Sequence, residues 1–136
     1  MEEALALSLL SFFAGRPEEE VLGRTVTQWI VTALPQTTVR VQKTQITFQN
    51  RHVFAALSLP RRARDRAAHA LTLTLGLPVR LDTPRVMMAA EPYPGRWTHH
   101  LLLSSPQDLD EELLGWVRAA AAFAQTKGTP PKEVTP

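Results

Sequence analysis

Apolar residues recur at helical spacing near both ends of the chain. Residues 3–13 are rich in leucine and phenylalanine and predict a first helix. The segment 17–34 begins with proline and three glutamates, which suit the first turn of a helix, and its apolar positions form one stripe. Residues 106–124 carry a similar stripe, with Ser105 placed as N-cap and Asp108 three positions later, as in a capping box. The pattern therefore predicts two helices at the N-terminus and one at the C-terminus.

Between these helices the apolar period shortens to two residues, which is the period of a β-strand. Most connections in this part are short, so consecutive strands are expected to pair antiparallel as a meander. We predict an α+β fold, a two-layer sandwich in which about six antiparallel strands are covered on one face by the three helices. The expected strands are 38–42, 45–49, 53–59, 70–77, 85–91 and 96–104.

Two turns set the expected register of the first three strands. The first turn places Val41 opposite Ile46, and a turn at Asn50–Arg51 places Phe48 opposite Val53. Both pairings gather apolar residues on one face of the sheet, which is the consistency that a correct register requires.

Strand alternation then separates two adjacent histidines in the last strand, because neighbouring strand residues point to opposite faces. His99 shares its side with Trp97, toward the core, while His100 shares its side with Arg96 and Thr98, toward an open and basic face. The two rings are therefore not expected to hold one metal ion. His99 is predicted to be a core histidine that a hydrogen bond satisfies.

The composition is that of an ordinary globular chain, with 136 residues, 44% of them hydrophobic and 21% charged. We expect one domain over residues 1–125 and a disordered tail over 126–136, which is polar and rich in proline. The absence of cysteine excludes disulfides and thiol catalysis and fits a cytoplasmic protein. Glu2 and Glu3 stand where a secretory signal carries cations, so export is not expected.

Charge is distributed unevenly along the chain. Residues 1–36 hold two arginines and five glutamates, a net charge of −3. Residues 37–106 hold ten basic and three acidic residues, a net charge of +7, and residues 107–136 hold three basic and five acidic residues, a net charge of −2. Either the basic centre meets an anionic partner, or it is offset within the molecule by the acidic helices, which is the interpretation we favour.

No motif of a known catalytic or cofactor site is present. The six glycines are scattered, so there is no phosphate-binding loop, and neither G-x-S-x-G nor H-E-x-x-H occurs. The four histidines lack the spacing of a helical metal pair. We therefore predict no catalytic residues, no metal ligands and no cofactor, and an enzyme is the least favoured of the functions considered, although a site assembled from distant residues stays open.

Three short motifs, in this order and spacing, resemble a family of small bacterial domains catalogued as a domain of unknown function, of which some members are labelled "predicted transport protein". The motifs are K-T-x-I-x-F followed by an aromatic strand, R-W-x-H-H, and D-x-E-L at the start of a helix. The resemblance covers about residues 10–124 and implies a standalone or accessory cytosolic domain with no assigned activity. The matching residues are Lys43, Thr44, Ile46, Phe48, Phe54, Arg96, Trp97, His99, His100, Asp110, Glu112 and Leu113.

The leading hypothesis is a non-enzymatic binding module that uses its open basic sheet face. Arg96 would clamp a phosphate or carboxylate, Lys43 would add a point charge, and Phe54 would provide a stacking surface. The partner is then a small anionic ligand or a protein, with no membrane involved. The candidate ligand-binding residues are Arg96, His100, Thr98, Lys43, Phe54 and Arg40.

Two alternatives remain open from the sequence. A loop with four arginines suits a nucleic-acid-binding accessory domain. The open face also suits a homodimer that closes sheet to sheet with no ligand, so both a monomer and a homodimer are compatible with the sequence. The loop arginines are Arg61, Arg62, Arg64 and Arg66.

Overall fold

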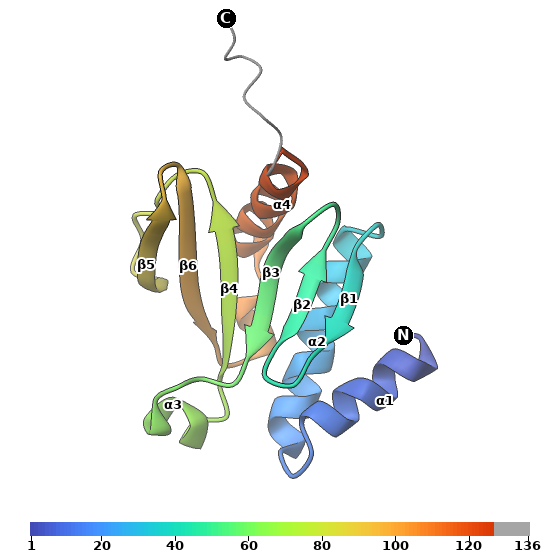
Figure 1. Cartoon of the computed structure of the whole chain (residues 1–136). Helices are drawn as coiled ribbons and strands as arrows, with labels where there is room; N and C mark the ends of the chain where they lie inside the picture. The colour runs from blue at the N-terminus through green and yellow to red at the C-terminus, as the bar shows by residue number, and fades with distance from the viewer. Residues whose placement is uncertain (127–136) are drawn as a thin grey trace, which may run out of the picture.

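The computed structural model describes residues 1–126, and Figure 1 shows that they form a sheet backed by helices. The predicted α+β architecture is confirmed, with six antiparallel strands in one sheet in the order β1-β2-β3-β4-β6-β5. The predicted tail lies outside the described residues except for its first residue, Thr126. The strands are β1 (Thr38–Val41), β2 (Ile46–Gln49), β3 (Val53–Ser58), β4 (Leu71–Leu77), β5 (Val86–Tyr93) and β6 (Arg96–Leu103).

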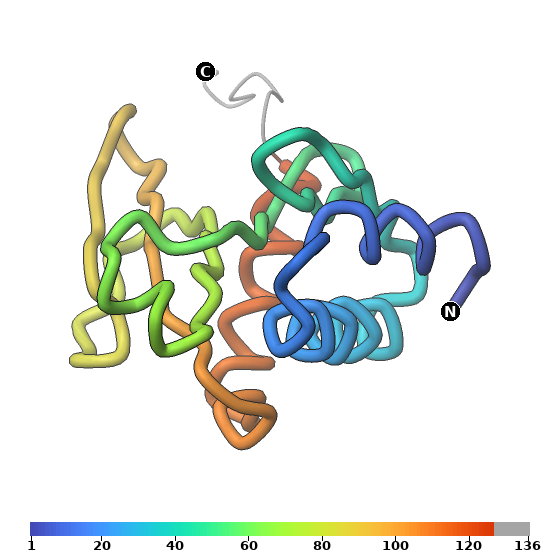
Figure 2. The backbone as a smooth tube through the Cα atoms, turned by 90° about the horizontal axis from the view of Figure 1, so that it is seen from below, coloured from blue at the N-terminus to red at the C-terminus, as the bar shows by residue number. Residues whose placement is uncertain are grey.

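The two longest helices, α2 and α4, lie against one face of the sheet, and the opposite face is left open (Figure 2). Helix α4 contacts β3 and β4, whereas α1 packs beside α2 and against the edge strand β1. A five-residue helix, α3, forms within the segment that the sequence predicts to be an arginine-rich loop. The helices are α1 (Glu3–Phe12), α2 (Pro17–Ala33), α3 (Ala63–Ala67) and α4 (Glu111–Thr126), with one 3-10 turn, η1 (Pro106–Asp108).

The hydrophobic core lies between the sheet and these helices. Strand β4 shows most clearly how alternation builds this core, since every second residue of the strand is buried and the residues between them are half-buried. Helices α2 and α4 contribute their apolar stripes to the same cluster, so helical and strand periodicity meet in one layer. Its central members include Leu22, Val26, Ile30, Leu71, Leu73, Leu75, Leu101, Leu113 and Val117.

The strand order departs from a simple meander at one point, because β6 lies between β4 and β5. After β4 the chain runs through residues 78–85 to the edge of the sheet and returns through a tight turn at Gly95, which has a φ of 72°. β6 then pairs with both neighbours, so the R-W-x-H-H strand has no free edge along most of its length.

The first predicted register is correct, and the second is wrong by two residues. Val41 pairs with Ile46 as expected, but Phe48 pairs with Ala55 instead of Val53. The connection between β2 and β3 is longer than two residues, and a bulge follows it, which adds one unpaired residue to β3 and breaks the alternation. Phe54 therefore belongs to the core with 2% of its surface exposed, while Val53 is 41% exposed.

The C-terminal helix also begins later than its capping pattern predicts. The Asp108 carboxylate accepts hydrogen bonds from the backbone N–H groups of Ser104 and Ser105, but these residues open only the 3-10 turn η1. Asp110 caps α4 instead, since its side chain accepts a hydrogen bond from the Leu113 N–H at 3.0 Å. Two capping signals in succession therefore produce a turn and then a helix.

Candidate functional site

The open face of the sheet places two polar side chains in contact at its centre. Thr74 of β4 is paired with His100 of β6, and the Thr74 hydroxyl lies 3.0 Å from His100 Nδ1. Both side chains are half-buried. Gly76 and Ala90, which flank the same face around Thr98, have little or no side chain, so the surface above Thr98 is not filled by its cross-strand neighbours.

His100 is held in its neutral form at neutral pH. Burial lowers the pKa of this histidine most strongly, and the positive charge of Arg61 lowers it further. A neutral imidazole offers one donor and one acceptor, and only Nδ1 is engaged among the described residues. Nε2 is therefore available for a ligand.

The arginine segment, residues 61–66, lies close to this face. The Arg62 guanidinium donates to Met87 Sδ on β5 at 3.8 Å, so the chain leaving β3 passes the ends of β4 and β6 on its way to this contact. Arg62 and Arg64 also face the Asp65 carboxylate at 3.3 and 3.9 Å. Arg66 donates to the Pro60 carbonyl. Within the described part of the chain, Arg61 is exposed and forms no hydrogen bond or ion pair.

The structure brings together only some of the predicted ligand-binding residues. Thr98 and His100 share the open face of β6. Arg96 is exposed at the start of the same strand, four residues and hence about 13 Å from His100 along an extended chain. Arg40 lies on β1, four strands from β6 and hence about 19 Å away, and Lys43 lies in the turn after it.

Phe54 cannot act as the expected stacking surface, because its side chain is in the core. The prediction placed it on the open face by counting alternate residues from Val53. The bulge in β3 invalidates that count, as described above.

His99 packs in the core, as predicted. It has no exposed surface, and its Nε2 accepts a hydrogen bond from the Leu81 N–H at 2.9 Å. Burial is the main cause that lowers its pKa, and the charge of Arg80 contributes in the same direction. The backbone of Leu75 acts in the opposite direction and raises the pKa, although Nδ1 of the ring has no partner that meets hydrogen-bond geometry. His99 therefore anchors the 78–85 connection as a neutral acceptor.

The D-x-E-L motif anchors the same connection from the other side. Arg85 donates to both oxygens of Asp110 at 2.9 and 3.0 Å and to Glu112 at 2.9 Å, and it stacks 5.5 Å from the Trp116 ring. Its interaction with Asp110 is the first cause that raises the pKa of Arg85. The pKa of Asp110 is lowered first by the Leu113 N–H and then by Arg85. This motif therefore ties β5 to the start of α4, which is a structural role.

The structure also assembles one cluster that the sequence did not predict. Glu18 and Glu19 of α2 lie against His69, which lies three residues after Arg66. Fifty residues separate Glu19 from His69, so no local spacing relates them. The one sequence feature that pointed here was the run of three glutamates, and helix capping already accounted for it.

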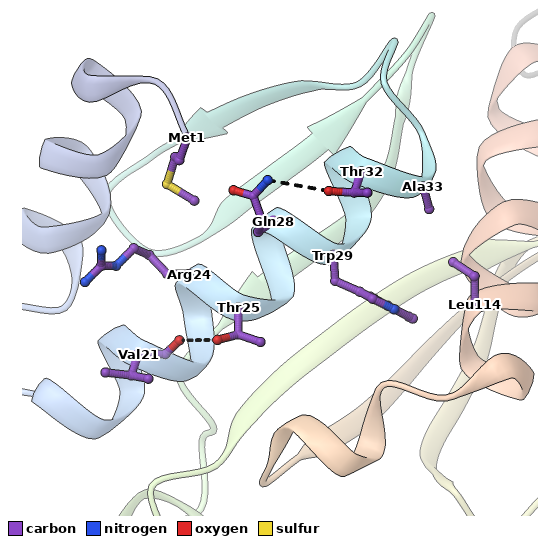
Figure 3. A pocket seen from close by; sticks show the side chains of 9 residues that line it. All are labelled: Met1, Val21, Arg24, Thr25, Gln28, Trp29, Thr32, Ala33 and Leu114. Atoms are coloured by element: carbon purple, nitrogen blue, oxygen red, sulfur yellow. Dashed lines mark hydrogen bonds between the residues drawn. The ribbon is translucent and has the colours of Figure 1, made fainter.

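A wide groove of about 750 Å³ lies on the helical side, between the N-terminus, α2 and α4 (Figure 3). Its lining is mostly apolar, with Trp29 and Leu114 facing one another across it. Its polar side chains bond within α2, as Thr25 does to the Val21 carbonyl, and Arg24 is paired with Glu20 outside the groove. No set of free polar groups converges there, so it is a weaker candidate site than the open sheet face.

These features define a two-layer α+β domain with one helix-covered and one open sheet face. A model of the family named domain of unknown function (DUF5655) matches residues 21–125, and the chain belongs to this family. No curated protein and no solved structure matches the chain. None of the described helices is long and apolar enough to cross a membrane.

Proposed function

We propose that this domain is a non-enzymatic binding module that takes a small anionic ligand on its open sheet face. The proposed site is centred on Thr74, His100 and Arg61, with Thr98 beside them. The proposal rests on a half-buried pair, Thr74 and His100, together with Arg61, whose positive charge acts on His100 and which forms no hydrogen bond or ion pair within the described residues.

The chemistry of these groups suits a phosphate or a carboxylate. Arg61 would supply a bidentate cation, which is the geometry that planar or tetrahedral anions accept well. The bonded pair of Thr74 and neutral His100 would donate one hydrogen bond to the ligand, from His100 Nε2–H when the Thr74 hydroxyl donates to Nδ1, without adding a charge that must be desolvated. Arg96, at the far end of β6, would extend the site for a longer ligand.

A thermal-shift screen of the full chain with inorganic phosphate, nucleotides and dicarboxylates tests the proposal. A ligand at one hundred times its dissociation constant stabilises the folded state by about 2.7 kcal/mol, which is easily measured. We expect at least one anion to raise Tm, and Arg61→Ala and His100→Gln each to weaken its binding at least tenfold.

The matched control is Arg40→Ala, which removes the same charge from the opposite edge of the same sheet. It should leave binding within twofold of the wild type. The proposed site is wrong if no anion raises Tm, or if Arg40→Ala weakens binding as much as Arg61→Ala does.

Nucleic-acid binding through the arginine segment is tested separately, by adding a single-stranded oligonucleotide to the same screen. Since Asp65 and the Pro60 carbonyl engage three of its four arginines, we expect a single-stranded oligonucleotide to bind no tighter than inorganic phosphate. Tight oligonucleotide binding that falls steeply with salt would favour that alternative instead.

A further inference from the structure

Glu18, Glu19 and His69 form a compact cluster at the junction of α2 with the start of β4. His69 Nδ1 lies 3.2 Å from Glu19 Oε2, and His69 Nε2 lies 3.5 Å from Glu18 Oε1. Each residue offers one potential metal-ligand atom, and these three atoms lie within 4.8 Å of one another. The cluster thus combines two carboxylates with one imidazole.

The Glu19 side chain is buried with too few partners for a carboxylate. It is 2% exposed, and its Oε1 atom is buried with no hydrogen-bond partner. The nearest arginine, Arg16, reaches Oε2 only at 3.8 Å and is itself 37% exposed. An ionised carboxylate removed from water needs a close cation or several donors to offset its desolvation, but among the described residues Oε2 has only the His69 ring at 3.2 Å and Arg16 at 3.8 Å, and Oε1 has no partner.

The backbone brings His69 to this position through an uncommon conformation. His69 has a φ of 59°, in the left-handed region that few residues other than glycine adopt. The bonds from the His69 N–H to the Arg66 carbonyl and from the Ala70 N–H to the Asp65 carbonyl close the end of α3 around it. The fold therefore holds the imidazole against α2.

We propose that Glu18, Glu19 and His69 bind a divalent transition-metal ion, of which Zn²⁺ is the best fit. Two ligands on one tetrahedral zinc ion lie about 3.3 Å apart, given metal–ligand bonds of about 2.0–2.1 Å, and the 3.2 Å between His69 Nδ1 and Glu19 Oε2 matches this separation. A mixed set of imidazole and carboxylate ligands suits zinc better than calcium or magnesium. Glu18 is 64% exposed, so it can turn toward the ion while water completes the coordination.

This site is separate from the proposed anion site, and neither depends on the other. Metal binding would link α2 to His69 and would neutralise the buried charge of Glu19. It therefore predicts a gain in stability that needs no anionic ligand.

The experiment uses the full chain without an affinity tag, stripped with EDTA and dialysed. Zn²⁺ is titrated by calorimetry and by competition with a chromophoric chelator, and bound zinc is counted by mass spectrometry. We expect one zinc ion per chain and a rise in Tm on adding Zn²⁺. His69→Asn, which tolerates the left-handed backbone, and Glu18→Gln should each raise Kd for Zn²⁺ at least tenfold.

Two control variants keep the test decisive. His52→Asn removes a histidine from the turn between β2 and β3, and Glu111→Gln removes an exposed glutamate from the first turn of α4. Both should keep the wild-type Kd. If His69→Asn does not fold, the exposed Glu18→Gln carries the comparison. The proposal is overturned if the wild type binds no zinc, or if the control variants weaken binding as much as Glu18→Gln.

Discussion

At the scale of single residues, the two adjacent histidines of β6 have different environments. His99 has no exposed surface and accepts the Leu81 N–H, whereas His100 is half-buried and contacts Thr74. The pKa of each is lowered, and burial is the first cause for both. Protonation of His99 would place a charge in the core and would also remove the acceptor of the Leu81 N–H.

This arrangement predicts an acid-sensitive stability. Because the folded state binds the His99 proton less readily than the unfolded chain does, the free energy of unfolding should fall as pH drops below the unfolded pKa of about 6.5. One such histidine gives a slope of at most about 1.4 kcal/mol per pH unit. Urea unfolding between pH 7.5 and 5 should show this loss, and His99→Gln, which keeps an acceptor without titrating, should reduce the slope.

The comparison variant is His100→Gln, which removes the other histidine whose pKa is lowered by burial and leaves His99 in place. Parallel curves for the wild type and His99→Gln would show that His99 is not responsible for the acid sensitivity.

At the scale of elements, α1 and α2 approach closely because Gly23 has no side chain. A Cβ atom at this position would lie 2.5 Å from the Phe13 ring, which is 2% exposed and cannot move into solvent without leaving the core. On α4, by contrast, a Cβ at Gly115 would meet no atom within 4 Å. The two helical glycines therefore have opposite consequences for stability.

Gly23→Ala should destabilise the protein by about 1–2 kcal/mol, since overpacking outweighs the helix propensity of alanine. Gly115→Ala should stabilise it by about 0.5–1 kcal/mol, because it gains the same propensity with no clash. Urea unfolding of both variants measures the difference. Equal gains in the two variants would contradict the close packing of α1 on α2.

At the scale of the whole molecule, the acidic helices and the basic centre meet in two places. His69 faces Glu18 and Glu19 at the start of α2, and Arg85 is paired with Asp110 and Glu112 around the start of α4. Among the described residues, Arg85 is the one Lys or Arg of the basic centre that is paired with a carboxylate of α4 or of the turn before it, so these contacts offset only a small part of the charge asymmetry.

The folding unit also extends beyond the residues that the family model matches. Leu9 and Phe13 are buried in the core, although the match begins at residue 21. Deletion of residues 1–15 should cost about 3–6 kcal/mol, from the lost burial of two large apolar side chains. We expect a lower urea midpoint and increased binding of a hydrophobic dye. Leu10→Ser, at a 56% exposed position, should change stability by less than about 0.5 kcal/mol. An unchanged midpoint after the deletion would show that α1 is dispensable.

Local periodicity determined most of the fold. Strands and helices follow from alternation and helical spacing, which depend on neighbouring residues alone, and the same alternation separated His99 from His100. The family resemblance rested on local motifs as well. Two of these motifs anchor the 78–85 connection: His99 of R-W-x-H-H accepts the Leu81 N–H, and Asp110 of D-x-E-L binds Arg85. Local signals were sufficient where the structure depends on a single element.

Only the tertiary structure decided what depends on contacts between distant segments. Strand pairing places β6 between β4 and β5 and introduces the bulge that buries Phe54. A simple meander and an unbulged hairpin would satisfy the same local pattern of apolar residues. His69 and Glu19, fifty residues apart, come together because the end of α3 closes against the first turn of α2. Proximity of this kind is a property of the packed chain, so no spacing along the sequence encodes it.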